Sequence, residues 1–221
     1  TIPITGAETV SDVDRKPAMQ PPSGLILASA SPRRRDLLRQ LGVRFEIIPA
    51  DVDESVNQDE PPGAYVTRLA RAKALAVWRA EGGRLPVLGS DTAVVLDGEI
   101  LGKPVDRDDA VAMLQRLSGR THEVYSGVAL VHGADRVDER LNVSRVTFAE
   151  LEAEWIAAYC ATGDPMDKAG AYGVQGRAGE RIARIEGSFY GVMGLPLYET
   201  SRLLEVLRCY SSDDSKTVSG A

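Results

Sequence analysis

The chain has 221 residues, which is enough for one large domain or two small lobes around a sizeable buried core. Its formal net charge of −6 argues against nonspecific nucleic-acid binding, which depends on a basic excess. Two cysteines exclude a disulfide framework and a cysteine-based zinc site, and they indicate a reducing, intracellular compartment.

The composition divides the chain into three parts. Residues 1–23, rich in proline, serine and threonine, predict a flexible leader, and residues 211–221 predict a polar tail. The folded domain is expected over 24–210. No apolar run approaches the roughly 20 residues of a membrane-spanning helix, and the N-terminal stretch lacks the apolar core of a secretion signal. We therefore expect a cytoplasmic protein with no membrane partner.

Strands and helices alternate along the domain. Short apolar runs predict strands, and apolar residues at helical spacing predict helices. Interleaved strands and helices predict a mixed α/β fold, with a twisted central sheet and flanking helices. In chain order we expect a strand at 25–29, a helix at 32–41, a strand at 43–49, a helix at 61–81, a hairpin within 87–103, a helix at 106–117, strands at 122–132 and 137–147, a helix from a capping box at 147–150 through 159, a glycine-rich loop at 167–179, a strand at 182–193 and a helix at 196–207.

The first candidate site is the turn from Ser29 to the arginines at 33–35. Ser31 is a plausible N-cap with Pro32 at the first helical position, so free backbone N–H groups, hydroxyls and guanidinium groups would form an anion site there. Helical residues lie about 100° apart, so the three arginines cannot all face one ligand. We expect Arg33 or Arg34 to bind it, with Arg35 in solvent. The alternative is an exposed basic turn.

The hairpin supplies a second candidate. A two-residue turn at Asp97-Gly98 predicts pairs from 96–99 through 92–103, which places Lys103 opposite Thr92 and beside Asp91. A carboxylate and an ammonium together suit metal and phosphate chemistry. Taken alone, a surface ion pair that closes the hairpin explains them as well.

Three weaker signals accompany these two. Lys73 lies at the edge of a buried helical stripe, where an ordinary lysine also extends its stem along apolar surface. The acidic stretch ending at Glu54 fits either a metal-ligand set or a solvated loop. In the glycine-rich loop, Gln175 offers a donor and an acceptor that could read a pyrimidine edge.

Together these segments resemble the Maf family of nucleoside triphosphate pyrophosphatases, from Leu25 to about Leu207. Several motifs in one order are far more specific than any one of them. The matching segments are Leu27 to Arg34, Glu54, Arg71 to Ala74, Gly89 to Thr92, Gly102 to Pro104, Leu117 to Gly119 with His122, Asp167 to Gly176, and Gly194 to Leu197.

The resemblance implies a fold like that of inosine triphosphatases, with two lobes around a cleft. It implies hydrolysis of a nucleoside triphosphate to the monophosphate and pyrophosphate, with Mg²⁺ or Mn²⁺ as the metal, in a homodimer. The loop at 167–176 resembles the branch that acts on dTTP and UTP in a house-cleaning role; the related 7-methyl-GTP branch has glutamate where Gln175 stands.

Site residues carried over from the family follow its motifs. Asp91 matches the general base, and Arg33, Thr92 and Gln175 match the specificity positions. Ser90 departs from the family, which usually has alanine there, so its hydroxyl could alter the hydrogen bonding of Asp91. We expect Asp91 and Glu54 to position the metal, Lys73 and Lys103 to act in catalysis, and the remaining binding residues to be Ser29, Ser31 and Arg34.

Three alternatives stay open. The first is pyrophosphate release from 7-methyl-GTP or another noncanonical nucleotide. The second is a nucleotide-binding regulator of septum formation without turnover, a process with which the family is also associated. The third is an α/β domain whose charged turns are merely solvated.

Overall fold

The computed structural model describes residues 24–213, and side chains through residue 207. The expected leader lies outside the described residues, as does most of the expected tail. None of the helices within the described range combines the length and the apolar character needed to cross a membrane. The elements are β1 (Ile26–Leu27), α1 (Pro32–Gln40), β2 (Glu46–Ile47), α2 (Pro62–Ala80), β3 (Val87–Leu96), β4 (Glu99–Leu101), α3 (Arg107–Leu117), β5 (Thr121–Gly133), β6 (Arg136–Phe148), α4 (Ala153–Cys160), the 3-10 turns η1 (Asp164–Asp167), η2 (Ala169–Ala171) and η3 (Arg177–Arg181), β7 (Ile182–Glu186), α5 (Phe189–Met193) and α6 (Leu197–Asp213).

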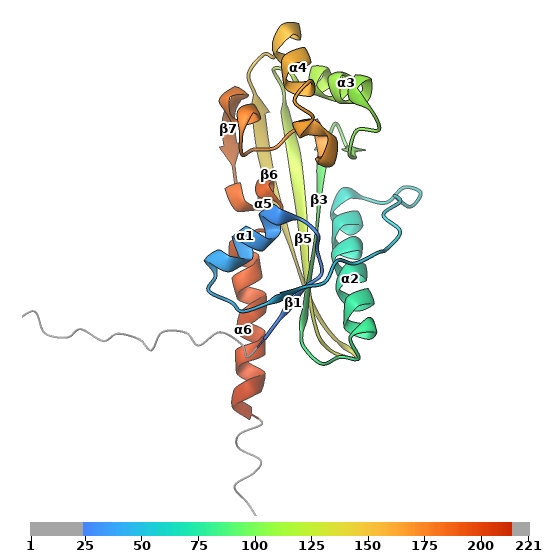
Figure 1. Ribbon diagram of the computed structural model, residues 1–221, viewed down its shortest axis with the longest axis vertical. Coiled ribbons are helices and arrows are strands. Elements are labelled where there is room, and N and C mark those ends of the chain that lie inside the picture. The colour runs from blue at the N-terminus through green and yellow to red at the C-terminus, as the bar shows by residue number, and fades with distance from the viewer. Residues whose placement is uncertain (1–23, 214–221) are drawn as a thin grey trace, which may run out of the picture.

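One mixed sheet runs the length of the molecule (Figure 1). Its strand order is β2-β1-β3-β5-β6-β7, and β4 pairs with β3. The short strand β1 is parallel to β2 and β3, whereas the remaining pairs are antiparallel. The strands β5 and β6, with 13 residues each, connect the two ends of the molecule. The predicted mixed α/β fold is confirmed.

The core is divided along these long strands. At one end, α3 and α4 pack with Val124, Phe148 and neighbouring side chains. At the other end, α1 and α6 cover one face of the sheet and α2 covers the other (Figure 1). Consecutive residues of β1 show this division, because Leu25 and Leu27 belong to the α1–α6 side while Ile26 and Ala28 belong to the α2 side.

Two glycines let α2 approach the sheet closely. A Cβ atom at Gly89 of β3 would collide with the Ala70 carbonyl oxygen, and one at Gly127 of β5 would lie 2.6 Å from the Val66 carbonyl oxygen. Both collisions are with helix backbone, which no side-chain rotation relieves. These glycines therefore set how near α2 lies to β3.

Two predicted elements are wrong. Thr147 and Phe148 do not begin a helix but end β6, where Phe148 pairs with Ile182 and the Thr147 hydroxyl hydrogen-bonds that of Thr121 at 2.8 Å. Burial of Phe148 in the sheet overrides the local capping signal, and α4 begins only at Ala153. The predicted strand at 182–193 is in part a helix, because α5 follows β7 and is capped by Ser188.

The hairpin register is confirmed for three pairs, 94–101, 95–100 and 96–99. The predicted pairs 93–102 and 92–103 are wrong. The Gly102 carbonyl instead accepts a hydrogen bond from the Gly170 amide at 3.0 Å, so the chain leaves β3 and turns toward η2. At the other end of the chain, the last helix is longer than predicted and continues to Asp213.

We expect Gly89→Ala to lower the free energy of unfolding by roughly 1–3 kcal/mol, because the new methyl group forces α2 away from β3. Urea unfolding measures the change. Gly102→Ala is the matched control, since no atom lies within 4 Å of a Cβ at that position. Equal stability of Gly89→Ala and the wild type would contradict the close approach.

Candidate functional site

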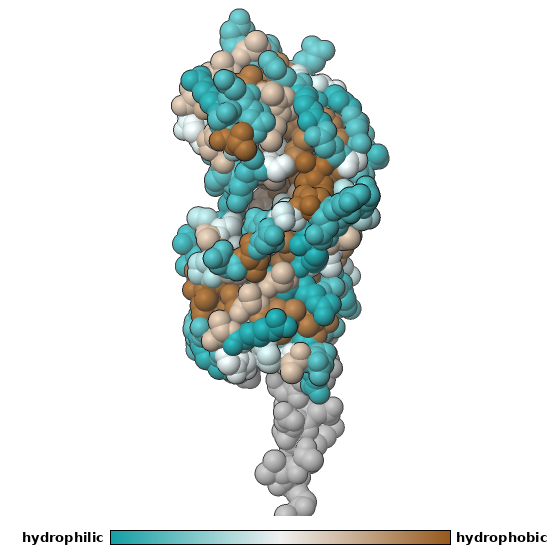
Figure 2. All heavy atoms as spheres, turned by 90° about the vertical axis from the view of Figure 1, so that its right-hand side faces the viewer, coloured by the Kyte–Doolittle hydropathy of each residue, from teal (hydrophilic) through white to brown (hydrophobic). Residues whose placement is uncertain are grey.

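A pocket of about 720 Å³ lies between the two ends of the molecule. Figure 2 shows this region as a hollow on the face that it presents, between an upper and a lower mass. Such a volume is typical of small-molecule sites. The start of α1, the middle of α2, β3, the chain after β4 and the η1–η2 segment all contribute to its wall.

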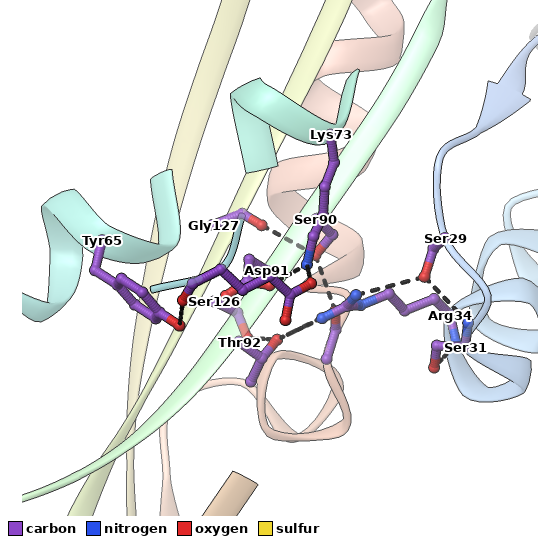
Figure 3. A network of polar contacts seen from close by, with 12 residues as sticks. Ser29, Ser31, Arg34, Tyr65, Lys73, Ser90, Asp91, Thr92, Ser126 and Gly127 are labelled. Carbon is purple, nitrogen blue, oxygen red and sulfur yellow. Dashed lines mark hydrogen bonds and ion pairs between the residues drawn. The ribbon is translucent and has the colours of Figure 1, made fainter. Parts of the chain in front are cut away.

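A buried lysine joins two carboxylates on this wall. The Nζ atom of Lys73 lies 2.6 Å from Oδ1 of Asp91 and 2.6 Å from Oε1 of Glu54 (Figure 3 shows the Lys73–Asp91 contact). The side chains of Lys73 and Asp91 are 9% and 10% exposed, while that of Glu54 is 49% exposed. Lys73 comes from the buried face of α2 and Asp91 from β3, so the close packing of helix on sheet makes this contact possible.

The charges around Glu54 favour its ionised form. Partial burial alone would raise the pKa of Glu54, but the hydrogen bond and charge of Lys73, with the charges of Lys103 and Arg34, hold it below its ordinary value. Glu54 therefore stays a carboxylate at neutral pH, available to a cation.

Arg34 is held inside the wall rather than at its surface. Its Nε donates to the Gly194 carbonyl at 2.8 Å, and its terminal nitrogens donate to Ser29 Oγ at 3.4 Å and Thr92 Oγ1 at 3.2 Å (Figure 3). Burial lowers the pKa of the guanidinium, an effect that the charge of Asp91 opposes. Arg34 thus ties α1 to β3 and to the turn at Gly194, and leaves one positive charge beside Asp91.

The start of α1 has the predicted capping geometry. Ser31 is the N-cap and accepts from the Arg34 amide, while its own amide donates to Ser29 Oγ at 3.2 Å. Arg33 lines the pocket and makes no hydrogen bond or ion pair within residues 24–207. Arg35 pairs with Asp36 and lies outside the pocket lining, as the helical geometry predicts.

The structure brings nearly all of the predicted site residues to one pocket. Lys103 lines it, although the pairing expected to place it there is absent. Gln175 is exposed and outside the lining, one residue beyond Val174, which is part of it. The predicted residues found in the lining are Ser29, Ser31, Arg33, Arg34, Glu54, Lys73, Asp91, Thr92 and Lys103.

Ser90 points away from Asp91 on the opposite face of β3. Its hydroxyl lies within donor distance of the Gly127 carbonyl, at 2.9 Å, and of the Gly194 carbonyl, at 3.0 Å. Ser90 therefore supports the same turn that receives Arg34. Among residues 24–207, no hydrogen bond joins the Ser90 hydroxyl to Asp91. The structure therefore does not support the expected influence of this hydroxyl on the hydrogen bonding of Asp91.

Sequence reasoning missed Tyr65, and in the loop at 167–176 it singled out only Gln175. Tyr65 donates to the Glu54 carbonyl at 3.0 Å, and burial, with the charges of Asp91 and Glu54, raises its pKa to about 12. Tyr65 and Lys73 are eight residues apart, which places both on one face of α2. The sequence therefore contains a signal for Tyr65. Lys168 and Tyr172 also line the pocket. The Tyr172 hydroxyl lies 2.7 Å from Nε2 of His122, whose pKa burial lowers to about 4.

The carboxylates fit a divalent cation that also binds substrate phosphates. No group of three or more histidine, cysteine, aspartate or glutamate side chains with metal-site geometry occurs among the described residues. Mg²⁺ commonly uses only one or two carboxylates and takes its other ligands from phosphates and water. Glu54 and Asp91 each contact Lys73 Nζ with one oxygen, at 2.6 Å, so the two carboxylates lie close together and their other oxygens supply such a pair.

Comparison with known proteins gives close relatives. The model of the Maf-like protein family matches residues 24–207. The chain is 53% identical to a dTTP/UTP pyrophosphatase from Aromatoleum aromaticum, over 82% of this chain and 94% of the relative. It is also 53% identical to a dTTP/UTP pyrophosphatase from Hahella chejuensis, over 82% and 90%. A solved nucleoside-triphosphatase, or dITP/XTP pyrophosphatase, from Mycobacterium abscessus matches 86% of this chain and 96% of its own at 15% identity, with a TM-score of 0.42.

We expect Ser90→Ala to lower the free energy of unfolding by about 1 kcal/mol, through loss of one buried hydrogen bond. Urea unfolding measures this change. Ser201→Ala, which removes an exposed hydroxyl bonded to a backbone carbonyl, is the control. Equal stability of Ser90→Ala and the wild type would contradict the buried hydrogen bond.

Proposed function

Because the chain belongs to the Maf family, we propose that it hydrolyses dTTP and UTP to the monophosphate and pyrophosphate. The observation that carries this proposal is the Lys73 bridge between Glu54 and Asp91, in a pocket that Arg33 also lines. A triphosphate needs cations at its oxygens, and water attack on it needs a fixed carboxylate. The names of the relatives at 53% identity support the choice of dTTP and UTP.

In this proposal, the start of α1 binds the phosphate chain. Arg33 and the free backbone N–H groups of the first turn contact the phosphate oxygens, with the hydroxyls of Ser29 and Ser31 beside them. Arg34 acts differently, since its nitrogens already bind Gly194, Ser29 and Thr92. It contributes a fixed positive charge and keeps α1 in place.

Asp91 is the proposed general base. Lys73 donates to its Oδ1, which orients the carboxylate so that the other oxygen can accept a proton from a water directed at the α-phosphorus. Lys73 and Lys103 then stabilise the charge that develops on the leaving pyrophosphate. Glu54 and Asp91 would hold a divalent cation, Mg²⁺ or Mn²⁺, which when bound neutralises phosphate oxygens.

We also propose a cytoplasmic location, which the low cysteine content supports, and a homodimer with a house-cleaning role, which the resemblance supports. Thr92 and Gln175 are the proposed specificity positions beside Arg33. For Gln175, which lies outside the lining, this role requires the loop after Val174 to approach the bound nucleotide.

We expect Asp91→Asn to lower kcat for UTP by roughly 10²–10⁴-fold, because the amide cannot accept the proton from water. Pyrophosphate release with Mg²⁺ measures this loss. Asp97→Asn, in the exposed turn between β3 and β4, is the control and should keep the wild-type rate. A near-normal rate for Asp91→Asn would exclude Asp91 as the base, and UTP binding without turnover by the wild-type protein would favour a regulator.

Removal of divalent cations with a chelator should abolish pyrophosphate release, and added Mg²⁺ should restore it. We expect Glu54→Gln to raise the Mg²⁺ concentration for half-maximal rate roughly tenfold or more, because the amide is a weaker ligand. Glu99→Gln is the control, since Glu99 pairs with Arg116 away from the pocket. An unchanged Mg²⁺ requirement in Glu54→Gln would remove Glu54 from the metal site.

A further inference from the structure

Glu54 lies on a loop that has no helix or strand of its own. This loop, residues 51–60, connects β2 to α2 and lies beside the first half of α2 (Figure 1). Residues 53–59 are all exposed, so buried apolar contacts do little to hold the loop in place. Glu54 nevertheless lies 2.6 Å from Lys73 Nζ. The position of the Glu54 loop must therefore come from polar contacts.

Two successive backbone carbonyls of the Glu54 loop accept hydrogen bonds from side chains of α2. The Tyr65 hydroxyl donates to the Glu54 carbonyl at 3.0 Å, and a terminal nitrogen of Arg68 donates to the Ser55 carbonyl at 2.9 Å. At about 100° per residue, Tyr65, Arg68 and Lys73 span less than half of the helix circumference. The side of α2 that supplies Lys73 thus also holds the backbone on either side of the Glu54 peptide.

Arg68 is itself fixed by a carboxylate at the end of the loop. Its Nε lies 2.6 Å from Oε1 of Glu60 and a terminal nitrogen lies 2.7 Å from Oε2, so the pair is bidentate. The Glu60 side chain is 9% exposed. The hydrogen bond from Arg68 lowers the pKa of Glu60 to about 2, so both groups stay charged at neutral pH. The guanidinium also lies over the ring of Tyr65, 5.6 Å from its centre.

Arg68 can influence a bound ligand only through the loop. It lies outside the pocket lining, whereas Glu54, Ser55 and Tyr65 are part of that lining. A guanidinium has no electron pair to offer a cation, so Arg68 is not a metal ligand. Its hydrogen bond to Ser55 does restrict the backbone next to Glu54, and an oriented carboxylate loses less conformational freedom when it binds a cation.

We propose that Tyr65 and Arg68 are positioning residues, which hold the Glu54 loop so that Glu54 presents its carboxylate to the cation bound with the triphosphate. This inference deepens the proposed function and rests on it for the role of Glu54. Tyr65 fixes the Glu54 carbonyl, and Arg68, held by Glu60, fixes the carbonyl of Ser55.

The test measures binding of the non-hydrolysable α,β-imido analogue of UTP by calorimetry, with and without Mg²⁺. The factor by which Mg²⁺ strengthens binding reports the cation site, whereas a loss of stability or of nucleotide contacts weakens both measurements alike. We expect Arg68→Met and Tyr65→Phe each to reduce this factor by about three- to tenfold, as is typical of one lost hydrogen bond. Arg71→Met is the matched control, because Arg71 lies on the same helix but pairs with Glu139 of β6.

Tyr65→Phe removes only a hydroxyl, so the test remains decisive if Arg68→Met, which leaves Glu60 unpaired, fails to fold. A second arm repeats Tyr65→Phe in a Glu54→Gln background. A residue that acts through the Glu54 carboxylate has nothing to position there, so we expect no further reduction of the factor. A further reduction as large as that in the wild-type background would overturn the inference.

The outcomes separate this inference from the proposed function. A reduced factor in Tyr65→Phe that disappears in the Glu54→Gln background supports the inference even if the wild type releases no pyrophosphate from UTP, in which case only the proposed function fails. An unchanged factor in Tyr65→Phe, in an enzyme that releases pyrophosphate, overturns the inference and leaves the function standing. An equal reduction in Arg71→Met also overturns it, as does a wild type whose binding Mg²⁺ does not strengthen.

Discussion

The site depends on one buried ammonium group between two carboxylates. Lys73 is almost fully removed from solvent, and a charge in that position is tolerated only when it is paired. Removal of one partner from such a buried pair typically costs about 3–5 kcal/mol. Glu54 and Asp91 supply the partners from segments on either side of α2 in sequence. The pairing that compensates for burial of the Lys73 charge thus also fixes the position of the Asp91 carboxylate, the proposed base.

That pairing follows from how closely a helix lies on a sheet. Gly89 and Gly127 remove the side chains that would separate α2 from β3 and β5, and Asp91 lies opposite Gly127 in the ladder. Ser90, whose side chain lies on the other face of β3, and Arg34 both bind the Gly194 carbonyl and hold the turn before α6. Alternation along β3 therefore sends one residue to the site and its neighbour to the framework that supports it.

Sequence reasoning succeeded where the signal was local. The turn at Asp97-Gly98, the N-cap at Ser31 and the helical face of α1 each follow from neighbouring residues, and the structure has them. It failed where contacts between distant residues determine the secondary structure. At Thr147 the local capping signal predicted a helix, but the pairing of Phe148 with β7 makes this segment the end of a strand. Taken singly, Asp91, Lys73 and Glu54 each fitted a structural or solvent-exposed role as well as a catalytic one. Only the fold brings the three side chains together.

We propose that the Lys73–Asp91 pair directs water at the α-phosphorus of a nucleoside triphosphate. The sharpest test is hydrolysis of UTP in ¹⁸O-labelled water, with the products separated and analysed by mass spectrometry. We expect one heavy oxygen in the uridine monophosphate and none in the pyrophosphate. Label in the pyrophosphate, or release of single phosphates, would place the attack on another phosphorus and exclude this role of the pair.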